Sequence, residues 1–182
     1  MADFKPAFAF VLLHEDPSCS GKVTEDAGGR TRFGIAGKFH PELAEEFFTG
    51  PAEEALAEAE KIEERDYWEP MRLAEIENQN VANKLFDMAV NMGVRQASIY
   101  AQRAANYLLG RGAAGPQTAA DRLVLVEDGR IGEKTLAAIN ACPAIEFHQA
   151  LCELSEAHYR HIAAVNPEQA VNLRGWLKRA QA

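Results

Sequence analysis

Three polar side chains near the start of the chain are candidates for the cleavage of a glycosidic bond. Glu15 ends an apolar helical run, Asp26 begins an Asp-Ala-Gly-Gly turn, and Thr31 follows that turn. Such cleavage needs a carboxylic acid that donates a proton, and usually a second polar group on the other face of the sugar. Glu15 fits the donor, because the apolar residues before it could partly desolvate its carboxyl group.

The roles of the other candidates have structural alternatives. Asp26 could stabilise positive charge on the sugar or activate water, or it could simply begin the turn. Thr31 could hold the attacking water, or it could be an ordinary strand residue. Gly28 and Gly29 would let the backbone turn and approach a bound glycan closely, as would Gly34.

A second pair of candidates lies on a predicted helix in the middle of the chain. Asp87 and Asn91 are one helical turn apart, and both could face a substrate cleft. The alternative is that they hydrogen-bond nearby backbone or a neighbouring loop.

The sequence indicates no metal or cofactor site. His148 and Cys152 are four residues apart, but this spacing fits no closed zinc motif. We identify no phosphate-binding loop, dinucleotide fingerprint or serine hydrolase motif. Carboxyl groups can hydrolyse a glycoside without a cofactor, so none is expected. Trp68 and Trp176 could stack on sugars, although single aromatic side chains in helices usually belong to the core.

Composition and charge restrict the class of protein. The 182 residues, 47% of them apolar and 25% charged, are enough for one domain with a sizeable core, or one domain with two lobes. The net charge of −8 argues against a nucleic-acid partner, which would require a basic face. Arg174, Lys178 and Arg179 predict only a small solvated patch.

We identify no membrane span and no secretory leader in the sequence. The apolar run at residues 8–13 is far too short to cross a bilayer, and it lacks a cationic flank and a small-residue cleavage site. The three cysteines are too few for a disulfide framework, which predicts free thiols in a reducing compartment. We expect synthesis in the cytoplasm, and action outside it would need a holin or an export machinery as a partner.

The spacing of apolar residues predicts a mainly α fold with one small β element. A short hairpin is expected across the Asp26–Gly29 turn, and a short strand at Leu123–Val126 before an Asp128-Gly129 turn. The glycine-rich residues 110–120 are the expected mobile loop, and the charges of residues 51–68 predict a solvated helix face. Helices are expected at residues 4–15, from about 41 to 48, and at 51–68, 80–92, 95–109, 132–140, 144–165 and 168–179.

The order and spacing of these motifs resemble glycoside hydrolase family 108. The first half carries Glu15 and, after ten intervening residues, the run Asp26-Ala-Gly-Gly-Arg-Thr-Arg-Phe-Gly-Ile35. The second half is similar to the family's C-terminal segment, which is described as a predicted peptidoglycan-binding domain. The similar runs are Phe86-Asp-Met-Ala-Val-Asn-Met-Gly93, Ala101-Gln102, Asp128-Gly-Arg-Ile-Gly-Glu-Lys-Thr-Leu136 and the closing Asn172-Leu-Arg-Gly-Trp-Leu-Lys-Arg179.

This resemblance implies a lysozyme-like N-acetylmuramidase, of a type often labelled secretion activator protein and often found as a phage endolysin. Such an enzyme would hydrolyse the β-1,4 bond between N-acetylmuramic acid and N-acetylglucosamine in peptidoglycan glycan strands. Glu15 would be the general acid, and Asp26 and Thr31 would assist. The enzyme would act in the periplasm or cell wall after its release.

The resemblance also implies an α+β lysozyme-like fold, with two helical lobes, a small β-hairpin element near the N-terminus and a cleft between the lobes. A catalytic lobe at residues 1–78, with Glu15 and the Asp26–Thr31 loop, and a helical lobe at residues 79–182, with the peptidoglycan-binding segment, would form one compact unit.

Several features near Glu15 depart from the family pattern. Asp16-Pro17-Ser18 follow Glu15 where the family usually has Gly-Gly-Tyr, the loop to Asp26 is longer than usual, and Arg32 stands where Asn is common. These departures leave open an alternative, a catalytically impaired peptidoglycan-binding protein that assists secretion. A third hypothesis is a helical interaction protein with no glycan role and no cleft at Glu15.

Overall fold

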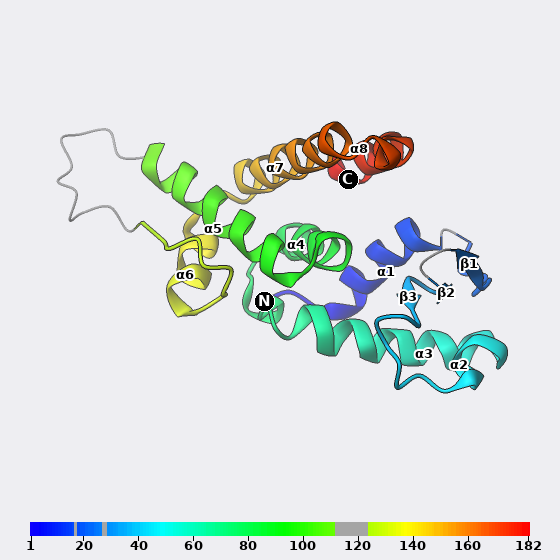
Figure 1. Cartoon of the computed structure of the whole chain (residues 1–182). Coiled ribbons are helices and arrows are strands. Elements are labelled where there is room, and N and C mark those ends of the chain that lie inside the picture. Colours follow the sequence, from blue (N-terminus) through cyan, green and yellow to red (C-terminus); the bar gives the residue numbers. More distant parts are fainter. Residues whose placement is uncertain (17, 27–28, 112–123) are drawn as a thin grey trace.

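Most of the molecule is helical, and a small antiparallel sheet lies at one edge of it (Figure 1). The computed structural model describes residues 1–16, 18–26, 29–111 and 124–182. It confirms the predicted mainly α fold with one small β element near the N-terminus. The strands are β1 (Thr24–Asp26), β2 (Gly29–Arg32) and β3 (Ile35–Ala36). The α-helices are α1 (Phe4–Glu15), α2 (Glu45–Thr49), α3 (Ala52–Glu63), α4 (Gln79–Met92), α5 (Val94–Arg111), α6 (Glu133–Ala141), α7 (Ala144–Val165) and α8 (Leu173–Ala180). The sheet lies beyond the end of α1 and beside α2 and α3 (Figure 1).

The sheet contains the predicted hairpin and one additional strand. Strands β1 and β2 pair antiparallel, with Asp26 opposite Gly29 and Thr24 opposite Thr31. Strand β3 pairs antiparallel with β2, and Thr31 lies opposite Ala36 there, so β2 is the central strand. Gly29 has φ +100, a conformation that glycine adopts more readily than other residues. The sequence did not predict β3, because two residues are too short to show an alternating pattern.

Helix α1 begins and ends where its sequence pattern predicts. The carboxylate of Asp3 accepts a hydrogen bond from the backbone N–H of Lys5, which satisfies one free donor of the first turn. Phe4, Phe8 and Val11 recur at helical spacing and are buried. This face orients α1 against the core and determines the direction in which its last turn points.

Helix α4 is the central helix of the fold, because α1, α5 and α7 all pack against it. It begins after Asn78, whose side chain accepts a hydrogen bond from the backbone N–H of Val81. It ends at Gly93, the predicted cap, which has φ +88. Phe86 and Met88 are fully buried, so most of the circumference of α4 contacts other helices.

An aromatic cluster joins the N-terminal helix to the centre of the molecule. The rings of Phe4, Trp68 and Phe86 lie 5.5–5.7 Å apart, centroid to centroid, in edge-on arrangements. Trp68 is 4% exposed, so it is a core residue and not a sugar-stacking residue. One hydrophobic cluster contains members from Ala2 to Leu151, and it therefore includes residues of both predicted lobes.

Two predicted elements differ from the structure, one in where it begins and one in whether it forms. The helix expected from about residue 41 begins only at Glu45, because His40 and Leu43 form a turn in which the Leu43 N–H bonds to the His40 carbonyl. The strand expected before Asp128 is wrong for residues 124–126. The backbone N–H and carbonyl of Leu125 both bond to the side-chain amide of Asn106, which takes the place of a partner strand.

Other differences concern the type of helix formed and the bounds of helices. The helix expected over residues 51–68 is α3 followed by a π-helix, η1 (Glu64–Trp68), and the helix expected over 168–179 begins as a 3₁₀ helix, η3 (Pro167–Asn172). A further 3₁₀ turn, η2 (Leu73–Glu75), precedes α4. Of the loop expected at 110–120, the first two residues belong to α5, and residues 112–120 lie outside the described part of the chain.

Candidate active site

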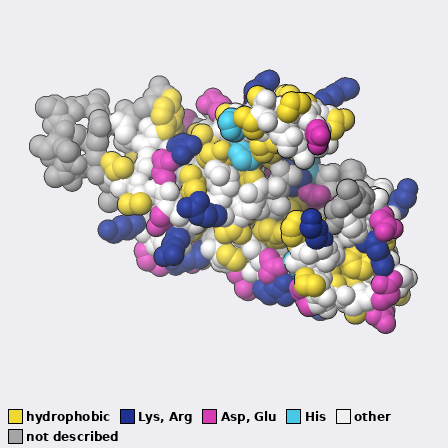
Figure 2. Space-filling model, in the orientation of Figure 1, with side chains coloured by type: hydrophobic (Ala, Val, Ile, Leu, Met, Phe, Trp, Pro, Cys, Tyr) yellow, Lys and Arg dark blue, Asp and Glu magenta, His cyan; other side chains and the backbone are white. Residues whose placement is uncertain are grey.

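Glu15 is the last residue of α1, and its side chain is 25% exposed. Gly34, in the turn between β2 and β3, lies directly against it, since a Cβ atom on Gly34 would be 3.1 Å from Glu15 Cγ. Gly34 also has φ +82, so the backbone conformation and the close contact both favour glycine. The sheet and the end of α1 therefore meet at Glu15. On the face seen in Figure 2, the surface is indented between the region of α7 and α8 and the region of the sheet.

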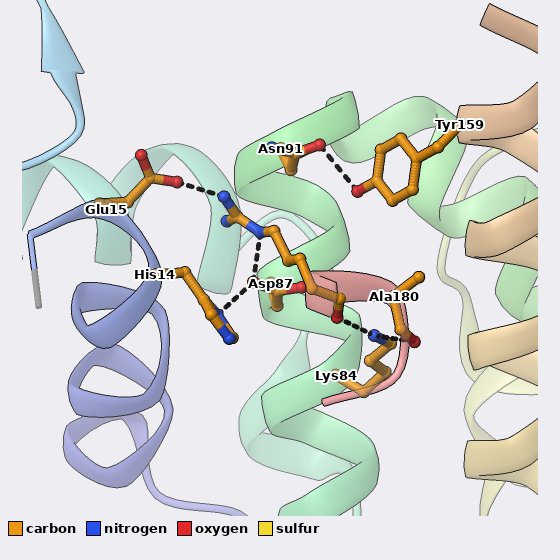
Figure 3. Close-up of polar contacts among 8 residues, drawn as sticks. His14, Glu15, Lys84, Asp87, Asn91, Tyr159 and Ala180 are labelled. Carbon is orange, nitrogen blue, oxygen red and sulfur yellow. Dashed lines mark hydrogen bonds and ion pairs between the residues drawn. The ribbon is translucent and has the colours of Figure 1, made fainter. Parts of the chain in front are cut away.

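The carboxylate of Glu15 pairs with a guanidinium from the far end of the sequence. Arg179 Nη1 donates to Glu15 Oε1 at 2.5 Å, and Arg179 Nε donates to Asp87 Oδ1 at 2.7 Å (Figure 3). His14 Nδ1 lies 3.2 Å from the same Asp87 oxygen. The side chains of Asp87 and Arg179 are 1% and 9% exposed. In such a buried position, charge-assisted hydrogen bonds are strong and directional, so Arg179 orients the Glu15 carboxylate.

A buried lysine holds the backbone of Arg179 in place. Lys84 Nζ, on α4, donates to the carbonyl oxygens of Arg179 and Ala180 at 2.9 and 2.8 Å (Figure 3). These carbonyls lie at the end of α8, where the helix itself provides no donors. Lys84 is 1% exposed, and burial lowers the pKa of its ammonium group. The lysine thus fixes the end of α8 against α4, with the Arg179 side chain directed at Glu15.

Glu63 is a second carboxyl group near this cluster. It ends α3, is 1% exposed, and its Oε2 atom has no hydrogen-bond partner among the described residues. Burial raises the pKa of Glu63 to about 8, and the negative charges of Glu15 and Asp87 raise it while Arg179 lowers it. At neutral pH, Glu63 is therefore mostly a protonated, uncharged acid.

Asn91 contacts α7 through its side-chain amide. Its Oδ1 accepts a hydrogen bond from the hydroxyl of Tyr159 at 2.7 Å (Figure 3). Burial raises the pKa of Tyr159, as does the nearby charge of Asp87, so the hydroxyl stays protonated and donates. The ring of Trp176 stacks on Tyr159, with centroids 5.4 Å apart. Trp176 is partly exposed, so it lies at the edge of the region that Asn91 and Tyr159 form.

The residues that depart from the family pattern have structural partners. Although desolvation raises the pKa of Asp16, hydrogen bonds from the Gly21 backbone and from Ser18 and Ser20 lower it below its ordinary value. The Asp16 carboxylate thus orders the loop after Glu15. Arg32, 6% exposed, donates to the carbonyl oxygens of Gly21, Phe47 and Gly50, so it joins β2 to that loop and to α2.

The structure brings some predicted site residues together and separates others. Glu15 and Asp87 share Arg179, and Asn91 lies on the same helix as Asp87. Asp87 is buried and bonds to the side chains of His14 and Arg179 on other helices, rather than to nearby backbone or a neighbouring loop, the partners that the alternative named. Among the remaining predicted residues, Thr31 is a partly exposed residue of β2, Gly29 begins β2, Asp26 ends β1, and Gly28 lies outside the described residues.

Two charged residues were assigned to the solvent by sequence reasoning, and the structure corrects this. Arg179 is buried and does not belong to the solvated patch expected with Arg174 and Lys178. Glu63 is buried, although the charges of residues 51–68 were expected on a solvated face. The helical period contained the signal, because Glu63 is four residues after the buried Ala59. Sequence reasoning did not consider Lys84, which is buried three residues after the buried Val81.

The described residues show no other centre that would suggest different chemistry. His148 Nδ1 and Cys152 Sγ are 3.6 Å apart, but no group of three or more metal-ligating side chains forms in the described ranges. The three cysteines are free thiols. Within the described part of the chain, every helix is too short or too polar to cross a bilayer. A cavity of about 440 Å³ is lined by Phe10, Asn83 and His148, among others, and by none of the predicted catalytic residues.

Comparison with known families and structures agrees with this architecture. Residues 8–93 match the family model Glycosyl hydrolase 108, and residues 96–181 match the model of a Predicted Peptidoglycan domain. A comparison with curated proteins found no match. Among solved structures, SagA from Brucella abortus is similar with a TM-score of 0.65 and 19% identity, over 98% of this chain and 93% of that chain. That likeness supports the fold.

The two family matches, which together span nearly the whole chain, define the class of protein. It is a glycoside hydrolase with a peptidoglycan-directed second half. The first half of the chain matches glycosyl hydrolase family 108 and the second half matches a predicted peptidoglycan domain, which together support a role in hydrolysing or binding peptidoglycan. This result argues against a helical interaction protein without a glycan role. Glu15, Asp87 and Asn91 lie in the first match, whereas Arg179 lies in the second.

Proposed function

We propose that this protein is an N-acetylmuramidase that hydrolyses the β-1,4 bond between N-acetylmuramic acid and N-acetylglucosamine, with Glu15 as the general acid. One observation carries the proposal. Glu15 is a partly exposed carboxyl group at the end of α1, within the glycosyl hydrolase segment, and Arg179 and Gly34 hold it in one orientation. A general acid needs such positioning to reach the glycosidic oxygen.

The sheet provides the candidates for the second role. Asp26 and Thr31 lie on β1 and β2, and the turn that follows β2 contacts Glu15 through Gly34. We propose that Asp26 stabilises positive charge on the sugar or activates the attacking water, and that Thr31 assists by hydrogen bonding to that water. Gly28 and Gly29 are proposed to let the strand connection approach the glycan.

A second candidate function is binding of peptidoglycan without hydrolysis, and one contact favours it. A general acid must carry a proton, whereas Glu15 is paired with a guanidinium, the arrangement of an ionised carboxylate. The predicted peptidoglycan domain would support binding in either case. For both functions we propose action in the periplasm or cell wall, reached through a holin or an export machinery.

The decisive experiment is turbidity loss of purified peptidoglycan sacculi, with the wild type, Glu15→Gln and the control Glu146→Gln, and with mass analysis of released fragments. Glu146 is an exposed carboxylate in the first turn of α7, so the control removes the same charge from a distant surface. Clearing by the wild type and the control only, with products that end in reducing N-acetylmuramic acid, would support the muramidase. Equal clearing by all three proteins would remove Glu15 from the mechanism. Sacculus binding without clearing would favour the binding function.

A further inference from the structure

Two complementary polar atoms near Glu15 are buried without partners. Glu63 Oε2 and Arg179 Nη2 are both inaccessible to solvent, and neither has a hydrogen-bond partner among the described residues. Unsatisfied buried donors and acceptors are uncommon, and each one requires an explanation. Glu63 Oε2 belongs to a carboxyl group, and Arg179 Nη2 is a cationic donor. The charge of Arg179 also lowers the pKa of Glu63, so the two side chains interact electrostatically.

Glu63 lies where the regular helix ends. The α-helix α3 stops at Glu63 and continues as the π-helix η1, in which the N–H of Glu69 bonds to the carbonyl of Glu64. Such π-helical turns occur frequently at functional sites. The carboxyl group of the adjacent residue, Glu64, is exposed to solvent, in contrast to that of Glu63.

The ionisable groups whose charges act on Glu63 come from three other helices, α1, α4 and α8. The negative charges that oppose its ionisation are those of Glu15 and Asp87, and the positive charge that favours it is that of Arg179. Burial raises the pKa of Tyr67, and so do the negative charges of Glu63, Asp66 and Glu15. Among the described residues, His14 on α1, Lys84 on α4 and Tyr159 on α7 are further titratable groups, which contact Asp87, the Arg179 backbone and Asn91.

We propose that Glu15 and Glu63 share one proton, and that Arg179 pairs with whichever of the two carboxyl groups is ionised. In the arrangement described, Glu63 holds the proton and Arg179 pairs with Glu15. In the alternative arrangement, Glu15 holds the proton, and the unpartnered Nη2 of Arg179 pairs with the Glu63 carboxylate. Glu63 is then a positioning residue that stores the proton Glu15 must donate, which resolves the conflict between an ion-paired Glu15 and its role as acid.

The exchange conserves atoms and charge. The Glu63 carboxyl group loses a proton and the Glu15 carboxylate gains it, so the three groups carry the same net charge before and after. The proton then passes from Glu15 to the glycosidic oxygen as the glycosidic bond breaks. The attacking water gives its hydroxyl to the sugar and its remaining proton returns to the carboxyl pair. This role in hydrolysis rests on the proposed function, whereas the sharing of the proton does not.

The first test follows the side-chain carboxyl signals of 13C-labelled glutamates by NMR as the pH is raised, in the full chain and without substrate. We expect one signal to titrate near pH 8, to be absent in Glu63→Gln, and to titrate at clearly lower pH in Glu15→Gln, because the opposing charge of Glu15 is then gone. A Glu63 signal that titrates at the same pH with and without Glu15 would overturn the proposal. Since Glu15 is partly exposed, its variant should fold even if Glu63→Gln does not.

The second test is the pH profile of sacculus hydrolysis. The wild type should retain activity until the shared proton leaves near pH 8, and Glu63→Gln should lose activity from a lower pH onward. A displacement of the alkaline limb by one pH unit lowers activity at a fixed alkaline pH about tenfold. Glu64→Gln, the exposed neighbour, should follow the wild type. An identical limb in Glu63→Gln would overturn the storage role. A wild type that never hydrolyses sacculi would refute the proposed function, and the NMR titration alone would then decide whether the proton is shared.

Discussion

Replacing Glu63 with Gln should change how the stability of the fold depends on pH. The pKa of this carboxyl group rises from its ordinary 4.5 to about 8 in the folded protein, chiefly because the group is buried. The folded protein therefore binds this proton more tightly than the unfolded chain does. The stabilisation of the fold that results is fully present below pH 4.5 and is lost as the pH rises to about 8. The full loss corresponds to roughly 5 kcal/mol of the free energy of unfolding.

Glutamine cannot ionise, so its variant should not show this loss. Relative to the wild type, Glu63→Gln should gain stability with rising pH, by about 3 kcal/mol at neutral pH and roughly 5 kcal/mol above pH 8. Any constant difference in packing between the two side chains cancels when the comparison is made across pH. A change of this size is a large fraction of the stability of an ordinary domain, and it should be easily resolved.

The measurement is urea unfolding of both proteins across this pH range, followed by tryptophan fluorescence, since Trp68 packs in the core and Trp176 at the site. Glu64→Gln serves as the control, because it removes the adjacent but exposed carboxylate. Parallel stability curves for Glu63→Gln and the wild type would refute the reasoning, since they would mean that Glu63 ionises as easily in the folded protein as in the unfolded chain.

Two further predictions concern the residues that hold the site. Lys84→Met preserves the side-chain volume but leaves the carbonyls of Arg179 and Ala180 without their donor, so unfolding in urea should show a loss of roughly 2–4 kcal/mol; wild-type stability would contradict the role given to Lys84. Gly34→Ala forces a methyl group against Glu15 at positive φ, and thermal unfolding should show a loss of about 1–2 kcal/mol together with slower sacculus hydrolysis. Gly175→Ala, a helical position with open space around it, should be neutral or stabilising, and equal losses in the two alanine variants would count against a specific contact at Glu15.

Local sequence patterns predicted most of the helices and the hairpin. The bounds of α1 and the start and end of α4 follow from caps and apolar spacing within a few residues, which is information that a sequence contains directly. Where a distant partner decides the structure, the prediction was wrong. Residues 124–126 have the composition of a strand, but the amide of Asn106 bonds to Leu125 and no strand forms there.

The candidate site was predictable only in part, for a related reason. Glu15 was identified because its position at a helix end and the downstream turn are close together in sequence. The partners that determine its environment, Arg179 and Glu63, are charged residues on helices with mixed patterns. Charged residues are rarely buried without compensation, so a reading based on one segment assigns them to the surface. Only the packing of α8 and α3 around α4 and α1 shows that they meet.

The contact between Glu15 and Arg179 joins residues that are 164 positions apart. The ribosome synthesises the chain from its N-terminus, so α1 emerges long before Arg179, the residue that orients the Glu15 carboxylate, has been made. At about 5–20 residues per second, this delay lasts on the order of ten to thirty seconds. During that time the carboxylate has neither its guanidinium nor the support of α8. The site around Glu15 is therefore complete only after the second half of the chain has been synthesised and packed, so a nascent chain does not yet contain it.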